Sequence, residues 1–223
     1  MTKGFFIAGT DTGIGKTRVS CALLHAFAAS GKKVVGMKPV AAGCENGQWM
    51  DVELLVAASN VTATREQINP YALMLPLSPH IAAVQESIQI DLTVIRQAHI
   101  ELNNHAEVVI VEGVGGFLVP LNDREDGADL AKILDLPVIL VVGMRLGCLN
   151  HALLTVKAIQ AEGLNLSGWV ANCIDPKMAA LEENIQSLKQ RLDCPLLGVL
   201  PFDEKADEQR LFELLDISKL VIF

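Results

Sequence analysis

The stretch from Gly9 to Thr17, GTDTGIGKT, decides the fold that the rest of the sequence must satisfy. It follows the apolar run FFIA at 5–8 and precedes a helical pattern over 17–30 that Gly31 closes. Strand, glycine-rich turn and helix form the setting of a phosphate-binding loop, where backbone N–H groups face phosphate oxygens. The first glycine lies one residue earlier than the usual G-x-x-x-x-G-K-[ST] spacing requires, so a plain glycine-rich turn is the alternative.

A phosphate-binding loop of this kind predicts a nucleotide and a magnesium ion. Lys16 is expected to reach the β- and γ-phosphates, and Thr17 to place its hydroxyl on magnesium. Magnesium takes oxygen ligands in near-octahedral geometry, so carboxylates should lie nearby. Glu112 ends the apolar run VVIVE, where a buried carboxylate is costly unless paired or metal-bound; a solvated strand end is the alternative. Asp51 opens a predicted helix, where metal binding and an ordinary N-cap are equally supported.

Short apolar runs alternate with longer amphipathic segments along the chain. Near-continuous apolarity is typical of strands covered on both faces, so we expect a doubly wound α/β fold of the P-loop nucleoside triphosphate hydrolase type, with a mostly parallel sheet and helices on both faces. The predicted strands are 5–8, 33–38, 108–113, 137–143, 167–174 and 195–202. The predicted helices are 17–30, 91–104, 128–134, 150–162 and 178–192.

One domain is expected over 1–223, because no repeat, low-complexity tract or Gly/Ser linker interrupts this alternation. The least regular region is 44–87, which holds Pro70, Pro76 and Pro79. We interpret it as an irregular insertion over the active edge. In open α/β sheets, ligands bind at the carboxyl ends of the strands. Polar residues that directly follow the strands are therefore the functional candidates.

Composition narrows the classes of partner and compartment. A net charge of −8 leaves no basic stripe for nucleic acid and no lysine run for an acidic membrane surface, so we expect neither partner. The apolar runs are shorter than the roughly 20 residues of a membrane helix, and the N-terminus lacks a cleavable signal pattern. Five scattered cysteines without a C-x-x-C pair argue against a disulfide framework and a zinc site. We therefore expect a cytoplasmic protein with reduced thiols.

Several motifs, taken together and in order, resemble one family. The motifs are GTDTGIGKT, GMKPVAAG, SPH, VEGVGG, LGCLNHALLT and GWVAN. They resemble the dethiobiotin synthetases from Gly9 to about Pro201, and the lengthened glycine spacing is that family's own form. The resemblance implies an ATP-dependent cyclo-ligase that joins CO2 to 7,8-diaminononanoate and closes the ureido ring of dethiobiotin, with release of ADP and phosphate.

By this resemblance, the catalytic residues are Lys38, Lys16 and Thr12. Lys38 ends a predicted strand, and Pro39 favours an extended backbone there that directs the lysine into the cleft. A fixed ammonium at this place can hold carbamate oxygens and offset the charge that grows during phosphoryl transfer. A solvent-facing lysine is the alternative. Thr12 is assigned to the substrate side, and a cap of the following helix is its alternative.

The resemblance also implies a set of ATP contacts. Asn172, in GWVAN, is placed on the adenine edge, where an amide can donate to and accept from the base. The region from Pro201 to Asp203 is expected to flank the same ring, and Glu208 lies in the tail that resembles the family least. The implied metal ligands are Thr17, Asp51 and Glu112. The full ATP-binding set is Gly13, Ile14, Gly15, Lys16, Thr17, Arg18, Asp51, Glu112, Gly113, Val114, Gly115, Asn172, Cys173, Pro201, Phe202, Asp203 and Glu208.

The implied substrate contacts include the start of a helix near Asn150. Free N–H groups there form an anion site that suits the terminal carboxylate of the substrate. In the family, this helix end comes from the second subunit of a homodimer, so each active site straddles the interface. The implied substrate-binding set is Thr12, Lys38, Ala42, Gly147, Cys148, Leu149 and Asn150.

Three positions depart from the family pattern. Ala42 stands where relatives often have serine, Arg145 replaces a usual lysine, and Gly13 fills a position that can be acidic. The alanine removes one hydrogen bond, worth about 0.5 to 1.5 kcal/mol net. The alternative function is a regulatory P-loop ATPase of the partition or site-selection type. That class predicts a basic or amphipathic docking surface, which this acidic sequence does not show.

Overall fold

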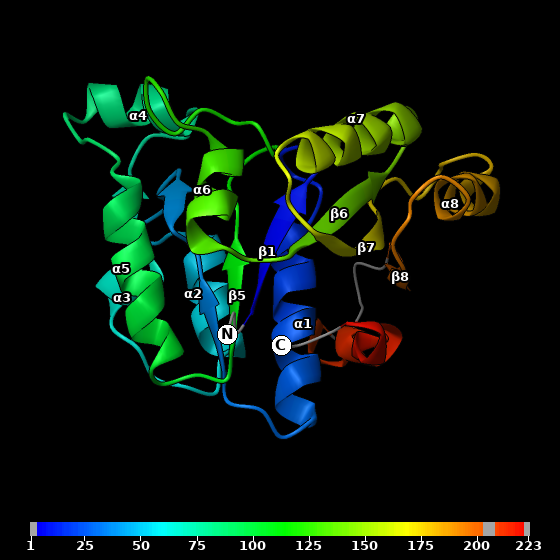
Figure 1. Cartoon of the computed structure of the whole chain (residues 1–223), viewed down its shortest axis with the longest axis horizontal. Coiled ribbons are helices and arrows are strands. Elements are labelled where there is room, and N and C mark those ends of the chain that lie inside the picture. Colours follow the sequence, from blue (N-terminus) through cyan, green and yellow to red (C-terminus); the bar gives the residue numbers. More distant parts are fainter. Residues whose placement is uncertain (1–3, 203–207, 221–223) are drawn as a thin grey trace.

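A single six-stranded sheet organises the computed structural model, which describes residues 4–202 and 208–220. Every neighbouring pair in this sheet is parallel. The strands, in order across the sheet, are β2 (Val34–Met37), β5 (Val108–Glu112), β1 (Gly4–Gly9), β6 (Val138–Met144), β7 (Leu166–Cys173) and β8 (Leu196–Leu200). They run side by side through the middle of the molecule in Figure 1.

Helices connect the strands. They are α1 (Lys16–Ala29), α2 (Met50–Ala58), α3 (Arg65–Ile68), α4 (Pro79–Gln85), α5 (Leu92–Asn103), α6 (Gly127–Leu134), α7 (Cys148–Ala161) and α8 (Leu181–Lys189), with 3₁₀ turns η1 (Glu208–Leu214) and η2 (Ile217–Lys219) near the end of the chain. In Figure 1, α5 lies on the left of the molecule and α8 on the right.

The alternation of side chains in β1 explains why helices cover both faces of the sheet. Phe6 and Ala8 point into the core that α5, α6, α7 and α8 share, whereas Phe5 and Ile7 point into the core beneath α1. The rings of Phe5 and Phe27 stack with centroids 6.0 Å apart. Successive strand residues face opposite sides, so a strand that is apolar throughout must be covered twice. The predicted doubly wound α/β fold is confirmed.

All six predicted strands are present, and the five predicted helices are also found with shifted ends. The largest difference is at the helix expected over 178–192, which is confined to Leu181–Lys189. The helix expected from residue 150 begins at Cys148, because Gly147 adopts a left-handed N-cap conformation with φ of 97°.

The interpretation of 44–87 as irregular is wrong in its secondary structure. This region contains α2, α3 and α4, and β4 (Tyr71–Leu73) pairs in parallel with β3 (Val40–Ala42) in a second, two-stranded sheet. Thr64 and Gln67 form a capping box that begins α3, and Pro79 lies in the first turn of α4. Proline in a first helical turn costs no hydrogen bond, so this proline marks a helix start.

The carboxyl ends of the central strands meet at one edge of the sheet. The strand order places the end of β1 between those of β5 and β6, and the Thr10 N–H donates to the Val141 carbonyl at 3.1 Å. Segments that follow these strands therefore converge. Among the helices that the structure describes, none combines the length and apolarity needed to cross a membrane.

Candidate functional site

The phosphate-binding loop connects β1 to α1. Gly15 is the N-cap of α1 with φ of 84°, and the helix start has no side-chain cap. A Cβ atom on Gly15 would lie 2.1 Å from Nδ2 of Asn172, so this position accepts glycine alone. Because no side chain caps α1, the alternative that the Thr12 hydroxyl caps this helix is excluded. The arrangement leaves backbone N–H groups at the start of α1 available to an anion.

Lys16 begins α1 and folds back over the end of β1. Its side chain is only 7% exposed, and a Cβ on Gly9 would lie 2.9 Å from its Cδ atom. Its ammonium donates to the Asp11 carbonyl at 2.9 Å. Burial, and then repulsion from Lys38, lower the pKa of Lys16 from 10.5 to about 8. The Lys16 ammonium is still protonated at pH 7, and a bound anion would raise its pKa.

A buried cation lies beside two carboxylates at the ends of β2 and β5. The Lys38 ammonium is 2.5 Å from Oε1 of Glu112 and 3.0 Å from Oδ2 of Asp51. Burial opposes the charge of Lys38, but the carboxylates of Glu112 and Asp51 outweigh it and raise its pKa. The same contacts overcome the burial of Asp51 and lower the pKa of its carboxyl. Lys38 and Asp51 therefore stabilise each other in their charged forms.

These contacts exclude three alternatives drawn from the sequence. Lys38 is 3% exposed and Glu112 is 1% exposed, so neither is a solvated group at a strand end. Asp51 lies within α2, whose N-cap is Trp49. Its carboxylate contacts Lys38, so Asp51 is not an N-cap.

The three predicted metal ligands lie together. Thr17 Oγ1 donates to Glu112 Oε1 at 2.9 Å, and the neighbouring Thr17 hydroxyl also helps to lower the pKa of Asp51. Glu112 Oε2 is buried and has no hydrogen-bond partner among the described residues. A buried carboxylate oxygen without a partner costs free energy unless something binds it. One hydroxyl and two carboxylates supply only oxygen donors, which fits the preference of Mg²⁺.

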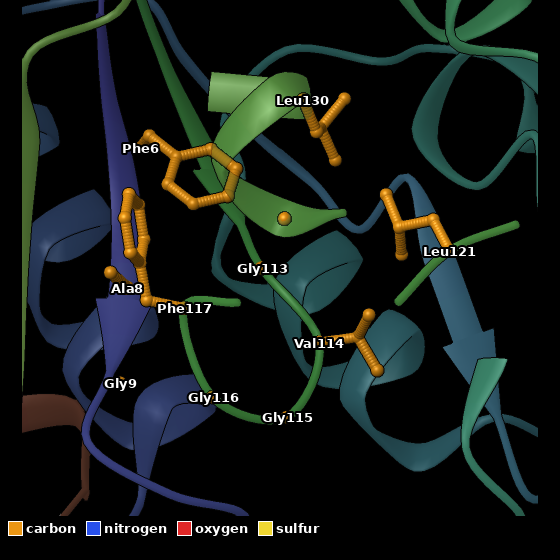
Figure 2. A pocket seen from close by; sticks show the side chains of 11 residues that line it. Phe6, Ala8, Gly9, Gly113, Val114, Gly115, Gly116, Phe117, Leu121 and Leu130 are labelled. Carbon is orange, nitrogen blue, oxygen red and sulfur yellow. The ribbon is translucent and has the colours of Figure 1, made fainter. Parts of the chain in front are cut away.

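A glycine-rich turn follows Glu112 and passes close to β1, as Figure 2 shows. The Gly113 N–H donates to the Ile7 carbonyl at 3.0 Å, and the Gly113 carbonyl accepts from Lys38 at 3.3 Å. Together with Gly9 and Phe6, this turn lines a small apolar hollow. Val114 and Gly115 are half-buried at the outer side of the turn.

The residues predicted to lie near the base gather on the outer side of the loop. Asn172 donates through Nδ2 to the Ile14 carbonyl at 2.7 Å. Arg18 donates to Asn172 Oδ1 at 3.2 Å and to the Pro201 carbonyl at 2.9 Å. These contacts tie the ends of β7 and β8 to the phosphate-binding loop. Cys173 is buried beside them, and burial raises the pKa of its thiol.

Phe202 is exposed where the first described segment ends. Asp203 lies outside the described residues. Glu208 is placed only as the first residue of η1.

The predicted substrate contacts fall in two places. Thr12 is exposed on the loop, and half-buried Ala42 lines a hollow with Trp49, Met50 and Asp51. Lys38 lies beside Asp51 at the first of these places. The other four residues, Gly147 to Asn150, form the start of α7. There the Cys148 N–H donates to the Arg145 carbonyl at 3.0 Å.

The sequence interpretation missed Asp11. Its carboxylate accepts from Thr12 N–H at 2.7 Å and forms an ion pair with Arg145. The available signal was the opposite charge of two residues that follow neighbouring strands.

This chain is similar to known proteins over almost its full length. A family model described as an AAA domain matches residues 3–210. An ATP-dependent dethiobiotin synthetase BioD of Nitrosospira multiformis is 66% identical, over 99% of this chain and 97% of the relative. The protein of the same name from Aromatoleum aromaticum is 57% identical, over 92% of this chain and 93% of the relative.

Solved structures with a similar fold belong to other P-loop proteins. The septum site-determining protein MinD from Pyrococcus horikoshii, complexed with Mg-ADP, has a TM-score of 0.59 at 18% identity, over 98% of this chain and 89% of that chain. The cell division protein FtsY from Thermotoga maritima has a TM-score of 0.57 at 16% identity, over 97% and 69%. Similarity at this level of identity concerns the fold alone. The near full-length relatives at 57% and 66% identity decide the family, and the chain belongs to the dethiobiotin synthetases.

Proposed function

We propose that this chain uses ATP to close the ureido ring of dethiobiotin from 7,8-diaminononanoate and CO2, with release of ADP and phosphate. The observation that carries the proposal is the buried Lys38 ammonium, held 2.5 Å from Glu112 and 3.0 Å from Asp51. Glu112 also accepts a hydrogen bond from Thr17 at the start of α1, and the Thr17 hydroxyl helps to lower the pKa of Asp51. A reaction that joins an anionic substrate to a phosphoryl group needs a fixed cation beside that loop.

The chemistry explains the need for ATP. A carbamate formed from one amine and CO2 is a poor electrophile, because its oxygen is a poor leaving group. Transfer of the γ-phosphoryl to that oxygen gives a carbamic–phosphoric mixed anhydride. The second amine attacks the carbonyl carbon and expels phosphate, which closes the ring. Phosphoryl transfer depends mainly on positioning and charge neutralisation.

Three residues would perform these tasks. Lys16 would bind the β- and γ-phosphates, since its ammonium lies at the start of α1. Lys38 would hold the carbamate oxygens and offset the growing negative charge. Thr12 is exposed on the loop, where its hydroxyl would donate to the carbamate or to the transferred phosphoryl group.

Thr17, Asp51 and Glu112 would hold Mg²⁺. When bound, the ion neutralises phosphate charge. The unpartnered Oε2 atom of Glu112 supports this assignment. Asp51 is half-exposed, with 49% of its side chain accessible, so it can bind an ion directly or through water. The base of ATP would lie near Asn172 and Pro201, whose contacts with Arg18 place them beside the loop.

We also propose a cytoplasmic homodimer in which the start of α7 binds the substrate carboxylate in the site of the other subunit. Gly147 leads into α7 without a side-chain cap, so N–H groups there are available to an anion. Leu146, beside this turn, is 95% exposed, and Leu154 on α7 is 59% exposed. Exposed apolar residues around a binding site favour contact with another chain. All five cysteines are free thiols, which suits a reducing compartment.

The test is an omission assay with purified protein, ATP, magnesium, bicarbonate and 7,8-diaminononanoate. Phosphate release and product mass are followed together while each component is left out in turn. The proposal predicts dethiobiotin only when all four components are present, with one phosphate per product. ATP hydrolysis that ignores the diamine and bicarbonate would instead support a regulatory ATPase of the partition type.

A further inference from the structure

An ion pair joins the phosphate-binding loop to the turn that begins α7. Asp11 lies two residues after β1, and Arg145 directly follows β6, the neighbouring strand. The Arg145 guanidinium donates to Oδ2 of Asp11. Both side chains are partly accessible, Asp11 at 43% and Arg145 at 42%, so the pair itself contributes little to stability.

Asp11 makes three different contacts with its polar atoms. Oδ1 accepts from the Thr12 N–H at 2.7 Å, Oδ2 accepts from Arg145, and the backbone carbonyl accepts from Lys16 at 2.9 Å. The two carboxylate contacts fix the rotation of the Asp11 side chain and the backbone that follows it. The direction of the carbonyl, and therefore the place of the Lys16 ammonium, depends on that backbone.

Arg145 is fixed on its own side as well. Its carbonyl accepts from the Cys148 N–H at 3.0 Å, within the turn in which Gly147 has φ of 97°. The guanidinium therefore extends from a turn whose backbone is closed by a hydrogen bond. This turn is anchored at the end of β6, a fully buried strand. A rigid support of this kind can hold a loop residue in one conformation.

We infer that Asp11 and Arg145 are positioning residues, whose ion pair holds the phosphate-binding loop so that Lys16 and Thr12 meet the γ-phosphate and the carbamate. The inference rests on the proposed function for the identity of these ligands. Because misplacement of reacting groups by about 1 Å can cost up to a hundredfold in rate, loss of the pair affects turnover far more than stability.

The test is a double-mutant cycle with Asp11→Asn, Arg145→Met and the double variant. Asparagine keeps an oxygen for the Thr12 N–H and removes the charge that pairs with Arg145. We expect each single variant to lower kcat/KM for MgATP about tenfold, and the double variant to fall no further. Arg145→Lys, which restores a cation, should recover most of the activity.

Lys132→Met is the matched control. Lys132, on α6, forms an ion pair of similar exposure with Glu162 at 2.7 Å. This variant should leave kcat/KM unchanged, and urea midpoints should be alike for all variants. Wild-type rates for the single variants, or losses that multiply in the double variant, would overturn the inference while the parent protein still makes dethiobiotin. Absence of ureido product from the parent protein would instead overturn the proposed function.

Discussion

Replacing Lys38 with methionine separates the structural role of the buried ion pair from its catalytic role. Methionine has a similar length and no charge, so Glu112 loses a partner 2.5 Å away and remains almost fully buried. Breaking a buried pair from one side costs about 3 to 5 kcal/mol. We therefore expect a loss of about 3 to 5 kcal/mol at pH 7.

The second variant in this experiment is Lys38→Met/Glu112→Gln, which removes the other charge. It should recover most of the lost stability, because an uncharged amide is far cheaper to bury than a carboxylate. It should recover none of the activity, because the Lys38 ammonium is still absent. Asp51 contributes less to the effect, because its half-exposed side chain can return to water.

Urea unfolding, followed by the fluorescence of the buried Trp169, measures both variants against the parent protein. An unchanged urea midpoint for Lys38→Met, or a double variant less stable than the single one, would refute the reasoning. Product formation by either variant would refute the catalytic role of Lys38.

The remaining predictions concern pH and backbone space. The pKa of Lys16 is lowered to about 8, so kcat/KM for MgATP should fall above about pH 8. A kcat/KM that does not change there would contradict the claim that MgATP needs the charged Lys16 ammonium. Burial lowers the pKa of His99 from 6.5 to about 4, so the unfolded state binds the extra proton between these values. The free energy of unfolding should therefore decrease by about 3 kcal/mol as the pH falls from 6.5 to 4, and His99→Gln should weaken this dependence in urea titrations. Gly15→Ala would place a Cβ 2.1 Å from Asn172 Nδ2, whereas a Cβ on Gly13 would meet nothing within 4 Å. Calorimetry should therefore find far weaker MgATP binding for Gly15→Ala than for Gly13→Ala. Equal binding by the two variants would contradict the close contact.

The sequence predicts the central sheet well because its strands are apolar on both faces. The run that forms β6 is apolar along its whole length, so it is recognised without an alternation of polar and apolar residues. The glycine-rich loop then identifies the strand before it and the helix after it. The second sheet is missed because β3 and β4 have three residues each, too few for a period to appear. A helix is expected from Asp51, but the extent of α2 is hard to define from sequence, since its apolar residues include exposed Met50 and Leu54.

The candidate site is predictable where one motif holds its residues and unpredictable where the fold joins distant ones. Lys16 and Thr17 follow from the loop motif, and Glu112 follows from a carboxylate at the end of an apolar strand. The contact of Asp51 with Lys38 depends on how α2 packs beside β2, and no spacing rule contains that information. The pair of Asp11 and Arg145 likewise requires the strand order, which places β1 beside β6.

Transfer of the γ-phosphoryl group to a carbamate oxygen is the central claim, and an isotope measurement tests it most directly. CO2 labelled with ¹⁸O in both oxygens is mixed with enzyme, MgATP and 7,8-diaminononanoate, and a single turnover is quenched before the label exchanges with water. Mass spectrometry then reads the phosphate and the product. The account predicts one labelled oxygen in the phosphate and one in the ureido carbonyl. Unlabelled phosphate beside labelled dethiobiotin would contradict it, because water would then have received the phosphoryl group.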